Sequence, residues 1–246
     1  MAPFFIMFLL VFAVPICVAI YQSFFRQVAS GGGLYGGGEL TNQFVGLDNF
    51  AMVITSGDFW TGMGRVVVYA AFQIPFMIIS ALVLALILDS FLIRRVGFFR
   101  LTYFLPFAIP GIVAAMVWLY IYTPELSPIV KVFDSFGIHV DFMAPGAPIL
   151  ASMANMTTWT YTGYNMLIFL AALQAIPHEL YEAARLDGAT SWQIVRQIKV
   201  PMVSSAALLA VLLSIIGTIQ LFNEPAVMYS SNRWMGNAYT PMMMAY

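Results

Sequence analysis

The chain has 246 residues, of which 61% are hydrophobic and only 9% are charged, and its formal net charge is −1. Soluble domains carry about 25% charged residues, so this composition excludes an ordinary water-soluble domain. A net charge near zero gives no indication of nucleic-acid binding. Cys17 is the single cysteine, which excludes an intrachain disulfide. Together these features predict a protein of the lipid bilayer.

Five apolar segments are long enough to cross the hydrocarbon core of a bilayer as helices. They comprise residues 3–25, 66–88, 98–122, 149–173 and 202–223. No Asp, Glu, Lys, Arg or His lies near the middle of any of them, where such a side chain would cost about 2.5–3.5 kcal/mol. Prolines 15, 75, 106 and 110 predict kinks inside the spans. The sequence therefore predicts an all-α polytopic membrane protein, with residues 1–246 forming one transmembrane domain.

The segments between the spans differ in charge and flexibility. The glycine-rich stretch 31–38 predicts a flexible loop. Six of the ten basic residues lie in the short segments 89–100 and 174–201. Because short basic loops stay in the cytoplasm, both segments are expected to face inward. After the fifth span, residues 224–240 are expected to form an outer loop, and residues 240–246 are too short to span.

The inward-facing segment 174–201 is a polar island with clear helix signals. Pro177 suits a first helical turn, and Gly188 suits a left-handed C-terminal cap. Thr190 and Gln193 form a capping-box pattern that starts a second helix over 191–198, and Pro201 is expected to end it. Two roles are open for this island from local chemistry: docking of another protein against its small alanines, or an amphipathic helix on lipid headgroups.

The long-range spacing of the island resembles a known motif. The island is similar to the EAA loop, whose pattern is E-A-A-x3-G-x9-I-x-L-P. In this chain the pattern begins with Glu182-Ala183-Ala184, continues with Gly188 after three residues and Ile198 after nine more, and ends with Val200 and Pro201. Val200 replaces the leucine. This loop belongs to the permease subunits of type I bacterial ABC importers, and the stretch 181–190 resembles the maltose-type sugar branch. Residues 45–50, Val-Gly-Leu-Asp-Asn-Phe, are a further similarity.

The resemblance implies a helix bundle with a cytoplasmic coupling helix in the bacterial inner (plasma) membrane. Five of its spans are present, and a sixth is expected to be missing. The expected partners are a second permease, two copies of a cytoplasmic ATP-binding subunit, an extracytoplasmic solute-binding protein and the lipid bilayer. The residues expected to couple the chain to the ATPase are Glu182, Ala183, Ala184, Asp187, Gly188, Ile198 and Pro201.

The chain itself is expected not to be an enzyme. No G-x4-G-K-[ST] phosphate loop is present in the sequence, so a partner would hydrolyse ATP. His139 and His178 are the only histidines, and we expect neither a metal nor a cofactor. His178-Glu179 begins like H-E-x-x-H, but Glu182 stands where the second histidine would be.

The expected cargo is a sugar or a related small solute. Polar and aromatic side chains inside spans are candidates for the substrate path because such groups are expensive in a membrane; the alternative is hydrogen bonding between helices. The candidates are Asn155, Trp159, Tyr161, Tyr164, Asn165, Gln220 and Asn223, with Gln73 in the second span. Glu224 ends the fifth span, where a solvated helix end, a gate and a contact with the binding protein are all open.

An ion-coupled secondary transporter is the alternative function. That class usually shows inverted repeats and a titratable group inside a span, and no such group lies mid-span here. Uptake that survived ATP depletion would favour it.

Overall fold

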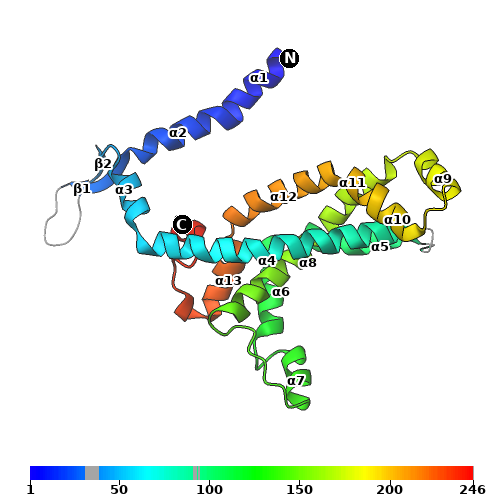
Figure 1. Ribbon diagram of the computed structural model, residues 1–246. Coiled ribbons are helices and arrows are strands. Elements are labelled where there is room, and N and C mark those ends of the chain that lie inside the picture. Colours follow the sequence, from blue (N-terminus) through cyan, green and yellow to red (C-terminus); the bar gives the residue numbers. More distant parts are fainter. Residues whose placement is uncertain (31–38, 91–92, 94, 246) are drawn as a thin grey trace. The chain divides into compact units, whose positions relative to one another are not determined.

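A computed structural model describes residues 1–30, 39–90, 93 and 95–245. The glycine-rich stretch 31–38 and Arg94 lie outside the described residues. The chain divides into two compact units, Met1–Trp60 and Thr61–Tyr246, which are described separately (Figure 1).

The first unit consists of a long apolar helix, a hairpin and a short helix. The long helix is formed by α1 (Ala2–Phe8), a π-helical turn η1 (Leu9–Ala13) and α2 (Val14–Ser23). Strands β1 (Phe25–Ser30) and β2 (Glu39–Phe44) pair antiparallel with Phe25 opposite Phe44, and α3 (Asp48–Thr55) follows. The hairpin was not predicted from the sequence.

Asn49 of α3 fixes the start of this hairpin. Its amide nitrogen donates to the carbonyl oxygens of Ser23 at 2.8 Å and Phe25 at 3.0 Å. Its amide oxygen accepts from the guanidinium of Arg26 at 2.8 and 3.1 Å. The 45–50 segment therefore holds the exit of the first helix in place.

The second unit is a bundle of long helices. Its first half contains α4 (Gly57–Leu88), α5 (Val96–Phe104), the 3₁₀ turn η2 (Leu105–Ala108), α6 (Gly111–Tyr122) and α7 (Pro128–Ser135). The second half begins with α8 (Ala147–Gln174), α9 (His178–Leu186), α10 (Ser191–Ile194), the π-helical turn η3 (Val195–Lys199) and α11 (Val200–Met202). It ends with α12 (Ser204–Ile219), α13 (Asn223–Ser231), η4 (Arg233–Met235) and α14 (Pro241–Met244).

Three described helical stretches are long and apolar enough to cross a bilayer, namely Ala2–Ser23, Gly57–Leu88 and Ser204–Ser231. Val96–Ala108 and Gly111–Tyr122 form a fourth only if they count as one span, and they are bent by 95°. The bend falls at Ile109 and Pro110, which have extended ψ values near 131°. The residue before a proline avoids the helical region, so the expected span 98–122 is broken rather than merely kinked.

Helix α8, expected as a span over 149–173, is 28 residues long but is not among those apolar stretches. Twelve of its residues are buried. Because neighbouring helices cover much of α8, polar side chains can be tolerated along it without facing lipid. The number of membrane crossings stays a prediction.

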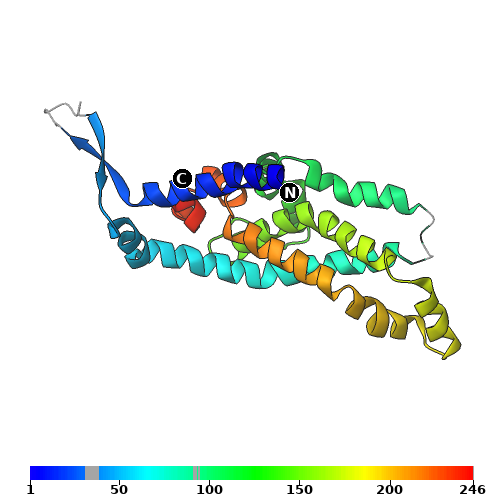
Figure 2. The same cartoon turned by 90° about the horizontal axis from the view of Figure 1, so that it is seen from above.

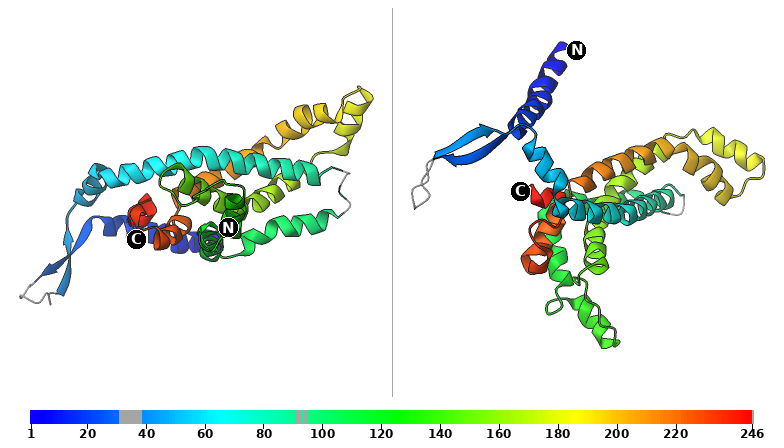
Figure 3. Two further views of the ribbon diagram at one scale, coloured as in Figure 1. Left: turned by 90° about the horizontal axis from the view of Figure 1, so that it is seen from below. Right: turned by 60° about the vertical axis from the view of Figure 1, so that its left-hand side comes forward.

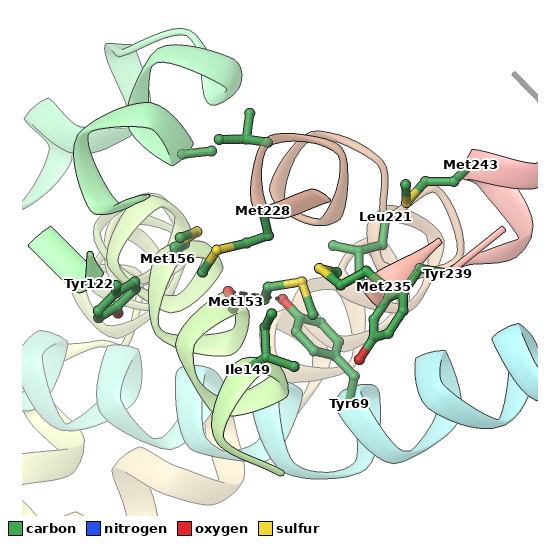
Figure 4. Close-up of a cluster of buried hydrophobic side chains, with 12 residues drawn as sticks. Tyr69, Tyr122, Ile149, Met153, Met156, Leu221, Met228, Met235, Tyr239 and Met243 are labelled. Atoms are coloured by element: carbon green, nitrogen blue, oxygen red, sulfur yellow. Dashed lines mark hydrogen bonds between the residues drawn. The ribbon is translucent and has the colours of Figure 1, made fainter. Parts of the chain in front are cut away.

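Helix α8 lies at the centre of the second unit, between α5 and α12 (Figure 2). A first core cluster includes Met153 and Met156 of α8 with Tyr69 of α4 and Met228 of α13; the Tyr69 hydroxyl lies 3.5 Å from the Met153 carbonyl oxygen (Figure 4). A second core cluster packs the other end of α8, around Phe169, against α4 and α12.

The contact between α5 and α8 depends on a glycine. A Cβ atom at Gly163 of α8 would lie 1.7 Å from the carbonyl oxygen of Tyr103 in α5. Only a residue without a side chain permits this approach, as is common where membrane helices pack closely.

The C-terminal segment packs onto α4. Arg65 donates from Nη1 to the carbonyl oxygen of Tyr239 at 3.1 Å, and its guanidinium lies 4.3 Å from the centre of the Tyr239 ring. Thr240 Oγ1 donates to the carbonyl oxygen of Leu221 at 3.0 Å. The segment therefore braces the break between α12 and α13.

Candidate functional site

A cavity of about 420 Å³ lies inside the second unit, between α4, η2, α8, α12 and α13. Its volume is within the range of small-molecule sites. The interruption between α12 and α13 forms part of its wall, at Gln220, Leu221 and Phe222. The polar and aromatic residues that line it are Tyr69, Gln73, Thr157, Tyr161, Tyr164, Asn165, Ser214, Thr218, Gln220, Asn223 and Glu224, with Phe107 and Phe222.

Five of the seven substrate-path candidates line this cavity: Tyr161, Tyr164, Asn165, Gln220 and Asn223. Gln73 lines it as well. The structure does not bring the remaining two to the cavity, and both contact α6 instead. Asn155 donates from Nδ2 to the Tyr122 hydroxyl at 2.8 Å, and the Trp159 ring meets Trp118 edge-on with centroids 5.8 Å apart.

An aromatic group forms one wall of the cavity. Phe107 of η2 stacks on Tyr164 with ring centroids 4.7 Å apart and an interplanar angle of 19°. The ring of Tyr161 approaches Phe107 at 66°, with centroids 5.7 Å apart. Such a surface offers apolar ring faces next to hydroxyl groups, which suits a solute with both C–H and O–H groups.

Two hydroxyl groups connect Tyr69 of α4 to a carboxylate that also lines the cavity. The Tyr69 hydroxyl donates to Thr157 Oγ1 at 2.6 Å, and Thr157 Oγ1 donates to Glu224 Oε1 at 3.2 Å. Glu224 is the second residue of α13 and is half-buried. It is therefore not a fully solvated helix end. Its contact with Thr157 joins positions far apart in the sequence, which local patterns do not reveal.

Gln73 lines the cavity but is almost fully buried. Its side chain is only 2% exposed, and its Oε1 has no hydrogen-bond partner within the described residues. Its Nε2 lies 3.3 Å from the Met77 sulfur. A buried amide oxygen without a hydrogen-bond partner is costly, and this oxygen lies beneath the cavity surface rather than on it.

A second candidate site is the polar loop between α8 and α12, which projects from one end of the second unit (Figure 3). Helix α9 ends at Leu186, and Gly188 follows with a φ of +82°. The predicted capping box is confirmed: Thr190 N donates to Gln193 Oε1 at 2.7 Å, and Gln193 N donates to Thr190 Oγ1 at 3.3 Å.

The prediction that Pro201 ends the second helix is wrong. Helical structure continues through Pro201 in α11, and α12 begins at Ser204. The π-helical turn η3 lies directly before it. Proline lacks an N–H and clashes with the carbonyl four residues earlier; a wider turn before it provides the room.

The loop exposes apolar as well as charged side chains. All nine residues of α9 are at least partly exposed, including Glu182 and Ala183 of the motif. Leu186 is 89% exposed, and Trp192 is 70% exposed. Neither large side chain was predicted from the sequence to be part of this site, although both flank the Gly188 turn.

Lys199 joins this loop to the end of α4. Its Nζ lies 2.5 Å from Asp89 Oδ2 and 5.2 Å from the centre of the Tyr181 ring. Burial and the nearby Asp89 carboxylate raise the pKa of Tyr181 above its usual range. The Tyr181 hydroxyl, like the Gln73 oxygen, has no hydrogen-bond partner in the described part of the chain. Three elements, α4, α9 and η3, therefore meet at one ion pair.

No cluster of three or more His, Cys, Asp or Glu side chains suited to a metal ion occurs among the described residues.

Comparisons with known proteins identify the class of membrane protein to which this helical bundle belongs. Residues 78–244 match the family described as binding-protein-dependent transport system inner membrane component. The chain therefore belongs to this family, and the predicted resemblance to importer permeases is confirmed.

Three curated relatives illustrate the similarity. The lactose transport system permease protein LacF of Rhizobium radiobacter is 33% identical over 78% of this chain and 65% of its own length. The sn-glycerol-3-phosphate permease UgpA of Agrobacterium fabrum is 31% identical over 81% of this chain and 67% of its own length. The probable ABC transporter permease YurN of Bacillus subtilis is 31% identical over 75% and 65%. The chain thus spans about two thirds of the length of these relatives.

Solved structures show the same fold. The chain matches a bacterial ABC transporter involved in import of the acidic polysaccharide alginate with a TM-score of 0.69 and 18% identity, over 98% of this chain and 76% of the other. It also matches a bacterial alginate ABC transporter in complex with a pentasaccharide-bound periplasmic protein, with a TM-score of 0.71 and 19% identity, over 99% and 85%. The predicted helical, polytopic permease fold is confirmed.

Proposed function

We propose that the chain is the membrane-spanning subunit of an ATP-driven importer for a sugar or a related small solute. A separate binding protein delivers the solute outside, and a pair of cytoplasmic ATP-binding subunits supplies the energy together with a second permease. Family membership supports the transport role. The names of the relatives, which refer to lactose, sn-glycerol-3-phosphate and arabinooligosaccharides, support a small polyhydroxylated cargo.

The cavity is the proposed substrate path within this chain. It combines stacked aromatic rings with side-chain hydroxyl, amide and carboxylate groups, which together can contact both faces and the hydroxyl groups of a sugar ring. Tyr161, Tyr164, Asn165, Gln220 and Asn223 are its proposed contacts. Asn155 and Trp159 are proposed to act only through the packing of α8 on α6.

The loop around Glu182–Gly188 is the proposed docking element for the ATPase, facing the cytoplasm. The observation that carries this proposal is the exposure of Leu186 beside the motif. A leucine that is 89% exposed next to small alanines and a glycine turn leaves a helix end that another protein can enclose. Asp187, Ile198 and Pro201 shape the turn and the helix that returns from it.

Charge reversal on one face of α9 tests this role. The full chain, co-expressed with its ATPase and tagged, is isolated from membranes, and the ATPase recovered with it is measured. Glu182→Lys is expected to lower that recovery and the solute uptake about tenfold, since a central interface contact is worth about 2 kcal/mol. Glu125→Lys, an exposed acid outside this loop, is the matched control and is expected to change neither.

Recovery in Glu182→Lys equal to that of the unaltered chain would show that the helix is not the docking element. Uptake that persists after ATP depletion but collapses with the ion gradient would instead support an ion-coupled transporter.

A further inference from the structure

The described lining of the cavity carries negative charge only. Among the described residues that line it, Glu224 is the single charged side chain, and no lysine, arginine or histidine accompanies it. Charges interact more strongly in a partly buried, low-dielectric site than in water. A carboxylate placed there opposes any anion that enters.

The position of Glu224 suits a carboxylate. Thr157 Oγ1 lies 3.2 Å from Glu224 Oε1 and 3.3 Å from the Met153 carbonyl oxygen, so its one proton can be donated to either acceptor. Glu224 also lies in the first turn of α13, where the helix dipole stabilises a negative charge.

The cavity also presents an acceptor that can take donors from the solute. A carboxylate can accept several hydrogen bonds, and Thr157 Oγ1 is within reach of one Glu224 oxygen. Hydroxyl groups of a solute can donate to this carboxylate, whereas ionised phosphate and carboxylate oxygens cannot.

We propose that Glu224 makes this cavity an anion-excluding site that takes a hydroxyl-bearing solute without negative charge. Phosphorylated and acidic sugars would be repelled by the carboxylate. The inference rests on the proposed function in taking the cavity as the transport path. It separates this chain from relatives named for sn-glycerol-3-phosphate and from the fold's alginate importers.

Thiol labelling measures the charge preference of the cavity without transport. Cys17, the single cysteine, is replaced in the full chain by serine, and Ser214→Cys supplies a thiol on the cavity wall. Membrane vesicles are treated with a trimethylammonium or a sulfonate methanethiosulfonate. Each labelling rate is divided by the rate of that reagent with free cysteine, and the cation-to-anion ratio is the result.

The ratio is expected to exceed one and to fall about fivefold in Glu224→Gln. Glu224→Asp is expected to keep most of it, and Glu125→Gln, an exposed acid that does not line the cavity, is expected to leave it unchanged. A ratio that does not depend on Glu224, or a thiol that neither reagent reaches, overturns the inference. A normal ratio in a chain that supports no uptake would instead count against the proposed function alone.

Discussion

Gly163→Ala tests the closest helix contact in the second unit. The added Cβ would lie 1.7 Å from the Tyr103 carbonyl oxygen, far inside the 3.0 Å limit for such contacts. The obstacle is backbone, which cannot rotate away, so α5 and α8 would have to separate by about 1.3 Å. Overpacking of this kind costs about 1–3 kcal/mol. For a chain of this size, that lowers the thermal midpoint by about 3–10 °C.

The assay is the thermal midpoint of the detergent-solubilised chain, followed by size-exclusion chromatography after heating. Gly64→Ala is the matched control, because a Cβ at Gly64 of α4 meets nothing within 4 Å and alanine favours a helix by about 1 kcal/mol. Gly163→Ala should also alter the cavity wall, since η2 follows Tyr103 and carries Phe107. Equal midpoints for the two variants would refute the close approach of α5 and α8.

Two further predictions concern the loop. Gly188→Ala should destabilise the loop by about 1–2 kcal/mol, because Gly188 has a φ of +82° although its surroundings leave room for a Cβ. Limited proteolysis of the loop measures this destabilisation. Gly97→Ala is the control, since Gly97 has an ordinary φ. Asp89→Asn and Lys199→Met should each lower the thermal midpoint, while the double variant should lose about 0.5–3 kcal/mol less than their combined effects. Strict additivity would show that the ion pair does not join α4 to the loop.

The helices were predictable from the sequence because apolar runs and caps are local features. The segments 66–88 and 149–173 fall within α4 and α8, and the Thr190 capping box forms as expected. The hairpin β1–β2 was missed because its polar strands lie beside a glycine-rich stretch and are fixed by Asn49, more than 20 positions away in sequence. Pairing of that kind is not encoded in a local window.

The cavity was only partly predictable, and helical periodicity explains why. Thr157, Tyr161 and Tyr164 follow one another at spacings of three and four residues and share a face of α8, whereas Asn155 and Trp159 lie on the opposite face. The sequence shows that there are two polar stripes on one helix. It does not show that the cavity is on one side and α6 on the other, because that depends on the bend at Pro110.

Pro201 lies within a continuous helical segment and does not end a helix. The path from Ser191 to Ile219 stays helical through η3 and α11, with one deviation at Val203, where φ is −90° and ψ is 8°. The other π-helical turn, η1, likewise lies directly before a proline, Pro15. In both places the wider turn keeps a helical rod continuous across a residue that would otherwise break it. The polar loop is therefore joined stiffly to α12 on one side and, through Lys199, to α4 on the other, so a displacement of the loop would move helices that line the cavity.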